Sequence, residues 1–152
     1  MPGTVYLIGT GPGDPGLLTV RGLECLAAAD VVVYDHQVHP RVIRRARPDA
    51  EKIDIGATSD RPLEHEAVCY LLAEKAREGK TVARLNWGEP FVFDRGGSEA
   101  LFLHEQGLRF EIVPGIPACT AVPCYAGIPI TYPGGGDTLT FVRGHGEDGM
   151  PA

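Results

Sequence analysis

The chain has 152 residues, of which 43% are hydrophobic and 22% charged, and its formal net charge is −6. This composition is ordinary for a folded domain and excludes a disordered chain, while the length allows one domain with its own core and no second complete one. The negative charge argues against a nucleic-acid partner, because such affinity comes from many Lys and Arg contacts with phosphates.

Signals for export, membrane insertion and metal binding are also missing from the sequence. Residues 1–8 lack the basic start and long apolar run of a leader, and no apolar stretch approaches the roughly 20 residues that span a bilayer. We therefore expect a cytoplasmic protein with no membrane partner. The cysteines lack Cys-x-x-Cys spacing, and Asp35, His36 and His39 have no second ligand cluster, so no metal is expected.

Short apolar runs alternate with segments of helical periodicity. Strands are predicted at 4–9, 30–35, 52–56, 81–86 and 109–113, and helices at 16–29, 40–46, 63–78, 98–106 and 117–126. The helix at 63–78 carries one apolar stripe and ends before Gly79, a residue typical of helix ends. This alternation predicts an α/β fold with an open, mainly parallel five-stranded sheet and helices on both faces.

The composition changes near residue 127. Residues 1–127 are expected to form an N-terminal α/β domain, and residues 128–137, rich in Gly and Pro, are expected to form a linker. An apolar run at 138–142 predicts one more strand, which has no partner in the remaining residues. We therefore interpret residues 138–152 as the first strand of a truncated second α/β domain.

The stretch GTGPGDPGLLT, residues 9–19, follows the first predicted strand, where a dinucleotide-binding turn would begin. Gly9 and Gly11 fit that motif, but Asp14 occupies the third glycine's position, and two prolines remove N–H donors that a phosphate needs. Pyrophosphate binding is therefore disfavoured. A carboxylate and outward carbonyls suit a cationic or neutral group, such as a sulfonium.

Three other polar loops follow predicted strands. They contain Asp35, the stretch WGEPFVFDRGG at 87–97, and VPGIP at 113–117. Because the carboxyl ends of parallel strands meet at one edge of a sheet, we expect these loops to form one small-molecule site with the glycine-rich turn. The alternative is a set of ordinary turns, which also need Gly and Pro.

Five segments, taken in order, resemble the tetrapyrrole methylases, and among them most closely the uroporphyrinogen-III C-methyltransferases. They are VYLIGTGPGDPGLLT, DVVVYD, AREGKTVARL, GEPFVFDRGG and VPGI followed by YAGIPIT, and the likeness extends from residue 4 to about 145. The resemblance implies two α/β domains, with S-adenosylmethionine bound in the cleft between them and the tetrapyrrole above it. It also implies a homodimer.

The resemblance assigns roles to individual residues. Asp35 matches the family's proposed proton acceptor, and Arg95 matches the arginine of its Arg-Gly-Gly substrate loop, so these two are the expected catalytic residues. Cofactor contacts are implied for Pro12, Trp87, Gly88, Glu89, Val92, Pro117 and Ala118. Substrate contacts are implied for Gly11, Asp14, Arg95 and Glu99.

The chain departs from the family pattern at several of these places. Ala57 replaces a lysine proposed as proton donor, Ser98 replaces an acid, and Trp87 and Asp94 stand where glycine is usual. Three hypotheses stay open: a tetrapyrrole C-methyltransferase of siroheme or cobalamin biosynthesis that acts on a substrate such as uroporphyrinogen III, a non-catalytic S-adenosylmethionine-binding relative, and a dinucleotide-binding oxidoreductase domain that uses Asp35 to hold a ribose.

Overall fold

The computed structural model describes residues 1–56 and 63–144. The chain divides into two compact units, Met1–Pro117 and Ala118–Ala152. The division lies at the start of the helix predicted at 117–126, and the domain boundaries predicted from the sequence stay predictions. The role of the second unit as the start of another domain stays a prediction.

The first unit contains every strand and helix predicted within it. In chain order these are β1 (Thr4–Gly9), the short 3-10 helix η1 (Pro15–Leu17), α1 (Val20–Ala28), β2 (Val31–Tyr34), α2 (Pro40–Ile43), β3 (Glu51–Asp54), α3 (His65–Arg77), β4 (Val82–Asn86), α4 (Gly96–Glu105) and β5 (Arg109–Val113). The helix predicted at 16–29 begins only at Val20, because Thr19 is extended and its hydroxyl accepts a hydrogen bond from the N–H of Gly22 at 3.0 Å.

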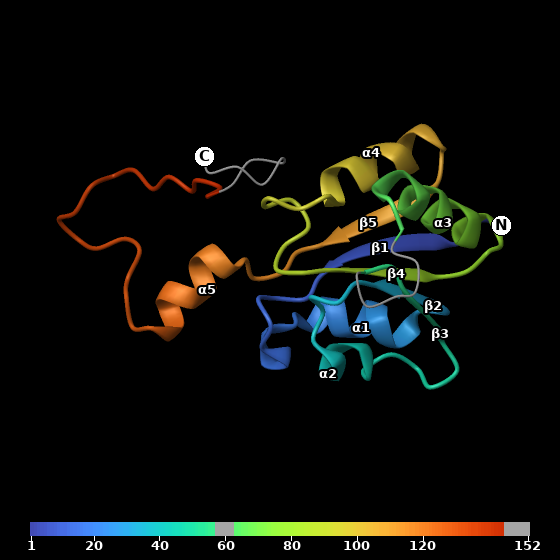
Figure 1. Cartoon of the computed structure of the whole chain (residues 1–152), viewed down its shortest axis with the longest axis horizontal. Helices are drawn as coiled ribbons and strands as arrows, with labels where there is room; N and C mark the ends of the chain where they lie inside the picture. The colour runs from blue at the N-terminus through green and yellow to red at the C-terminus, as the bar shows by residue number, and fades with distance from the viewer. Residues whose placement is uncertain (57–62, 145–152) are drawn as a thin grey trace. The chain divides into compact units, whose positions relative to one another are not determined.

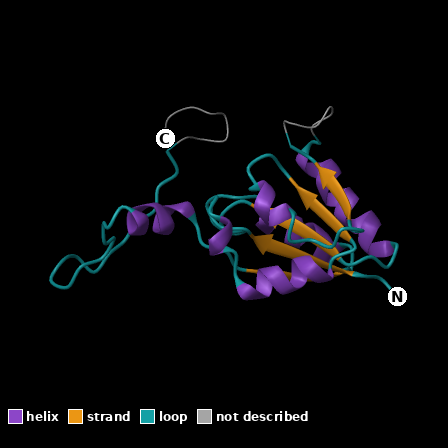
Figure 2. Cartoon of the chain, turned by 90° about the horizontal axis from the view of Figure 1, so that it is seen from below, coloured by secondary structure: helices purple, strands orange, loops and turns teal. Residues whose placement is uncertain are grey.

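The five strands form one sheet in the order β3-β2-β4-β1-β5, and every neighbouring pair is parallel. Figure 2 shows the arrows running in the same direction. The predicted parallel α/β sheet is thus confirmed. Its consequence for function is that all five strands end at the same edge.

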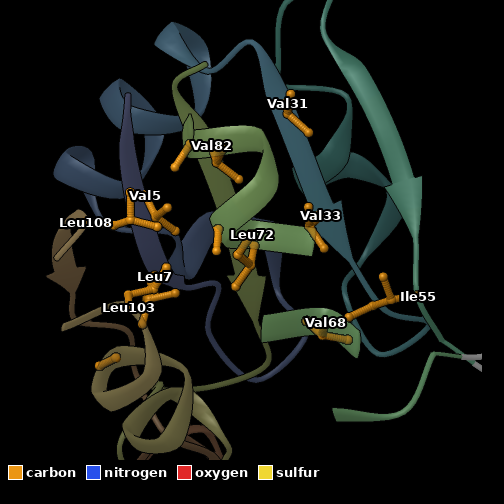
Figure 3. Packing of buried hydrophobic residues seen from close by; sticks show 13 residues of the cluster. Val5, Leu7, Val31, Val33, Ile55, Val68, Leu72, Val82, Leu103 and Leu108 are labelled. Carbon is orange, nitrogen blue, oxygen red and sulfur yellow. The ribbon is translucent and has the colours of Figure 1, made fainter. Parts of the chain in front are cut away.

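Helices cover both faces of the sheet, as predicted (Figure 1). Because side chains alternate along a strand, β1, β2, β4 and β5 each supply residues to both cores. The core beneath α3 and α4 includes Val5, Leu7, Val33, Leu72 and Leu103 (Figure 3). The core beneath α1 and α2 includes Ile8, Leu26, Val32, Val42 and Leu85.

The predicted end of α3 at Gly79 is also confirmed. Gly79 has a φ of +82°, a conformation that side-chain-bearing residues rarely adopt. Its N–H donates to the carbonyl of Ala76 at 3.0 Å, and the N–H of Lys80 donates to the carbonyl of Lys75 at 3.2 Å. These two bonds satisfy carbonyls that the end of the helix leaves free.

The described part of the second unit contains α5 (Ala118–Tyr125), followed by turns and irregular chain up to residue 144. The strand predicted at 138–142 is not formed. A strand requires a hydrogen-bonded neighbour, and within residues 1–56 and 63–144 no segment forms a ladder with it. The assignment of residues 138–152 to a second domain therefore stays a prediction.

Candidate functional site

The loops that follow β1, β2, β4 and β5 share one edge of the sheet. Because β4 lies between β2 and β1, its loop lies between the loop with Asp35 and the glycine-rich turn. The chain leaves β1 and β2 toward the face covered by α1 and α2, but leaves β4 toward the face covered by α4. Such a switch in direction is where open α/β sheets bind ligands.

Glycine backbones join three of these loops. The N–H of Gly11 donates to the carbonyl of Gly88 at 3.1 Å, and the N–H of Gly88 donates to the carbonyl of Gly11 at 2.9 Å. A Cβ placed on Gly115 would lie 2.1 Å from the Gly88 oxygen and 2.7 Å from the Cα of Gly9. The loops after β1, β4 and β5 therefore meet through backbone atoms that no side chain separates.

Four N–H groups of the glycine-rich turn already have partners, two of them within the turn and two at Asn86 and Gly88. The N–H of Thr10 donates to the Asn86 carbonyl at 2.9 Å, and that of Gly11 to Gly88. Asp14 accepts twice, from Gly16 N–H at its Oδ1 (2.7 Å) and from Leu17 N–H at its carbonyl (3.0 Å). The two prolines of the turn have no N–H at all. These bonds and the two prolines reduce the number of donors left for a phosphate, which speaks against the dinucleotide hypothesis.

Asp35 is half-buried at the end of β2. Its Oδ1 accepts a hydrogen bond from the N–H of Gln37 at 2.9 Å. Among the described residues nothing else bonds to this carboxylate. Gly56, after β3, packs closely behind it, since a Cβ there would lie 2.7 Å from the backbone nitrogen of His36.

The backbone of Arg95 is held by hydrogen bonds, and its side chain is exposed. Its N–H donates to Asp94 Oδ1 at 2.7 Å, and its carbonyl accepts from Ser98 Oγ at 2.8 Å. The residue is exposed, and within the described residues its guanidinium forms neither an ion pair nor a hydrogen bond. A planar guanidinium in this state is available for a ligand carboxylate.

Glu99 lies in the interior. Only 1% of it is exposed, and its Oε1 is 3.0 Å from Nε of Arg84, which is 5% exposed. The implied substrate contact of Glu99 has no support from this position. Nearby, loss of water around the carboxyl of Asp94 raises its pKa, and the Glu99 charge adds to this, while the N–H of Arg95 and the charge of Arg84 oppose it.

The other implied site residues divide by location. Pro12 and Glu89 are half-buried on the rim, and Oε2 of Glu89 accepts from the N–H of Phe91 at 2.7 Å. Trp87, Val92 and Asp14 are exposed on the same loops, Gly11 and Gly88 are buried with positive φ, and Pro117 ends the first unit. Ala118 begins α5 in the second unit, and Ala57 lies outside the described residues.

One side-chain hydrogen bond at this edge was not predicted from the sequence. The Nε2 of His65 lies 2.8 Å from the Oγ of Ser98, although the two residues are 33 positions apart. Each stands in the first turn of its helix, α3 or α4. No periodicity within either helix indicates this pairing, because it depends on how the two helices pack side by side.

A sequence profile described as Tetrapyrrole (Corrin/Porphyrin) Methylases matches residues 4–150. The chain belongs to this family. Among curated tetrapyrrole methylase relatives, the siroheme synthase of Chromobacterium violaceum is 46% identical over 97% of this chain and 32% of its own length. The siroheme synthase of Pseudomonas entomophila is 45% identical over the same shares.

Solved structures agree with this tetrapyrrole methylase assignment. The uroporphyrin-III C-methyltransferase of Thermus thermophilus is 41% identical, with a TM-score of 0.79 over 88% of this chain and 57% of that one. A complex of that enzyme with S-adenyl homocysteine has a TM-score of 0.80 over 99% and 59%, with 39% identity. The chain thus spans about a third of the curated relatives named above and under two thirds of these structures.

Proposed function

We propose that the chain forms the N-terminal part of an S-adenosylmethionine-dependent C-methyltransferase that acts on a tetrapyrrole such as uroporphyrinogen III, in siroheme or cobalamin biosynthesis. The observation that carries this proposal is the Arg95 guanidinium on the β4–α4 loop, which has no ion pair or hydrogen bond with the described residues. It lies at the edge of the sheet where the connections after neighbouring strands β1 and β4 leave toward opposite faces. Membership of the tetrapyrrole methylases and the names of the relatives support it.

The residues of this edge fit S-adenosylmethionine. Its sulfonium is positively charged, and the rim carries the carboxylates of Asp14, Asp35 and Glu89, whereas four N–H groups of the glycine-rich turn already have partners. Bound there, the sulfonium supplies an electrophilic methyl group with a good leaving group. The residues of the first unit proposed to hold it are Pro12, Trp87, Gly88, Glu89, Val92 and Pro117.

The chain's own contribution to the reaction is orientation and proton transfer. The Arg95 guanidinium pairs with a carboxylate of the tetrapyrrole and holds the acceptor carbon in line with the methyl group; such placement is worth up to about 7–11 kcal/mol in model reactions. Methyl transfer leaves a positive charge on the tetrapyrrole, and the Asp35 carboxylate takes the proton that the methylated tetrapyrrole then loses. The bond between Asp35 and Gln37 keeps that carboxylate in place during transfer.

Replacing Arg95 tests the proposal. In Arg95→Gln we expect the KM for uroporphyrinogen III to rise by about tenfold or more, because a charge-assisted, two-pronged contact is lost. The affinity for S-adenosylhomocysteine, followed by the fluorescence of Trp87, the single tryptophan, should not change. Arg45→Gln, at an exposed arginine after α2, is the control. An unchanged KM in Arg95→Gln would count against the proposal.

A non-catalytic relative is the second candidate. It is favoured by the Ser98 hydroxyl, which is engaged by His65 and the Arg95 carbonyl and supplies no acid where the family pattern has one. Tight binding of S-adenosylhomocysteine without methyl transfer to any tetrapyrrole would identify it.

Partners and location follow as expectations from the proposed function. We expect a tetrapyrrole as the small-molecule partner, a homodimer and a cytoplasmic location. In the part of the chain that the structure describes, no helix has the length and apolar character to cross a membrane. Sedimentation of the protein as its source produces it tests the dimer.

A further inference from the structure

Three residues form a chain of hydrogen bonds from α3 to the β4–α4 loop. The Oγ of Ser98 lies 2.8 Å from the carbonyl oxygen of Arg95 and 2.8 Å from Nε2 of His65. A carbonyl only accepts, so the single hydroxyl hydrogen of Ser98 goes to Arg95. The Ser98 oxygen then accepts from His65, whose Nε2 carries the hydrogen.

This direction excludes a nucleophilic Ser–His pair. Such a pair needs a histidine nitrogen that accepts the hydroxyl proton, and here the hydroxyl proton is given to the Arg95 carbonyl. The Sγ of Cys69 lies 3.8 Å from the same His65 nitrogen, one turn further along α3, and supplies no base. His65 therefore holds the β4–α4 loop in place by donating a hydrogen bond to Ser98.

The backbone of Arg95 is held from both sides. Its N–H donates to Asp94, and its carbonyl accepts from the Ser98 hydroxyl and from the N–H of Glu99 at 3.1 Å. All three partners are neighbours in sequence. His65 is the member of this network that belongs to another helix, so it connects the loop to the packed body of the domain.

The loop adopts a conformation that its sequence does not favour by itself. Phe93 has a φ of +53°, which is uncommon for a bulky residue. Gly96 packs against the loop's beginning, where a Cβ would lie 2.5 Å from the carbonyl oxygen of Pro90. A strained loop persists only when its surroundings impose the conformation, and the bond from His65 is one such constraint.

We propose that His65 is a positioning residue for substrate binding, which acts through Ser98 to fix the backbone from which the Arg95 guanidinium reaches the tetrapyrrole carboxylate. This inference rests on the proposed function of Arg95. It assigns a role to Ser98 as well: the hydroxyl, in place of an acid, joins α3 to the substrate loop.

The test compares His65→Ala, Ser98→Ala and His65→Gln in the protein as its source makes it. We expect the KM for uroporphyrinogen III to rise by about five- to tenfold in each alanine variant. The double variant should show no larger rise, because each single substitution already breaks the same chain of hydrogen bonds. The kcat and the affinity for S-adenosylhomocysteine stay unchanged. His65→Gln keeps an N–H donor at similar reach and restores the wild-type KM.

His104→Ala, at an exposed histidine in the last turn of α4, is the matched control. An unchanged KM in folded His65→Ala or Ser98→Ala overturns the proposal. So does an equal loss in His65→Ala and His65→Gln, or a loss of S-adenosylhomocysteine affinity equal to the loss of substrate affinity, since either would mean a general structural role.

Hydrogen exchange separates this inference from the proposed function. If the wild-type protein methylates no tetrapyrrole, the proposed function fails, and the loop is judged by the exchange of backbone amides at 91–97. Faster exchange in His65→Ala and Ser98→Ala but not in His65→Gln supports the positioning role. Equal exchange in all variants overturns it.

Discussion

Gly115 and Gly88 are in backbone contact, so close that a Cβ on Gly115 would lie 2.1 Å from the Gly88 carbonyl oxygen. Gly88 in turn exchanges two hydrogen bonds with Gly11. The loops after three parallel strands are thus assembled through glycines, and the position of the proposed cofactor residues Trp87 and Glu89 depends on that assembly.

Gly115→Ala is expected to destabilise the first unit by about 1–3 kcal/mol, because the added methyl group must push the loop after β5 away from the one after β4. Urea unfolding measures this difference. Gly97→Ala is the control, since a Cβ there has no atom within 4 Å and a helical glycine replaced by alanine gains about 0.5–1 kcal/mol. Equal stabilities of the two variants would contradict the proposed role of the glycine contacts.

Asp35→Asn is expected to lower kcat by about 10²–10⁴-fold, because an amide cannot accept the proton that a carboxylate accepts. The amide oxygen still accepts from the Gln37 N–H, so the turn keeps its shape. Calorimetry with S-adenosylhomocysteine should give the wild-type affinity. If that affinity is lost with the activity, Asp35 belongs to cofactor binding or to the structure, and the proton-acceptor role is wrong.

Glu99→Gln is expected to lower the free energy of unfolding by about 3–5 kcal/mol, because it leaves the buried charge of Arg84 uncompensated. Glu105→Gln, on the exposed last turn of the same helix, should change stability by less than about 0.5 kcal/mol. Thermal unfolding of both variants tests this. A Glu99→Gln protein of wild-type stability with a raised substrate KM would instead restore the substrate contact implied by the family resemblance.

Asp94 gives the stability a specific pH dependence. Its pKa is higher in the folded than in the unfolded state, so the folded state binds this proton more readily. Stability therefore falls as the pH rises from the unfolded-state pKa through the folded-state pKa. Asp94→Asn keeps an acceptor for the Arg95 N–H and removes the charge. We expect the variant to be more stable than the wild type at neutral pH, with a difference that shrinks toward about pH 4. A difference independent of pH would contradict this.

Asp30 has a lowered pKa, so its effect on stability depends on pH in the opposite direction to that of Asp94. Its carboxylate accepts from the N–H of Thr81 at 2.8 Å and pairs with Arg47 at 3.2 Å, and these contacts, the backbone bond foremost, lower its pKa. Its contribution to stability is present above the ordinary pKa of aspartate and is lost as the pH falls. Asp30→Asn should therefore be less stable than the wild type at neutral pH, and urea unfolding should show the gap closing on acidification.

The strands and helices could be predicted because each has a local cause. The apolar runs of β1, β2 and β4 are buried on both faces of the sheet, and Gly79 ends α3 through its positive φ. The run at 138–142 has the same local character but no hydrogen-bonded neighbour among the described residues. Strand formation there depends on a partner, which local pattern does not report.

The sequence predicts which loops share one edge of the sheet, but not the side-chain contacts between the elements. Parallel strands bring Asp35 and the β4 loop together whatever their side chains, whereas the bonds of His65 with Ser98 and of Arg84 with Glu99 arise from helix packing. A charged Arg84 inside an apolar strand was a usable signal for a buried partner. His65 gave no such signal, since a histidine at the start of a helix is unremarkable.

The most direct test of the proposed function uses the protein as its source produces it, incubated with S-adenosylmethionine and uroporphyrinogen III. Mass spectrometry of the tetrapyrrole and quantification of S-adenosylhomocysteine are read from the same reaction. We predict that the tetrapyrrole gains methyl groups on carbon, with one S-adenosylhomocysteine formed for each. Binding of S-adenosylhomocysteine without any methylated product would contradict the proposed activity and identify a non-catalytic member of the family.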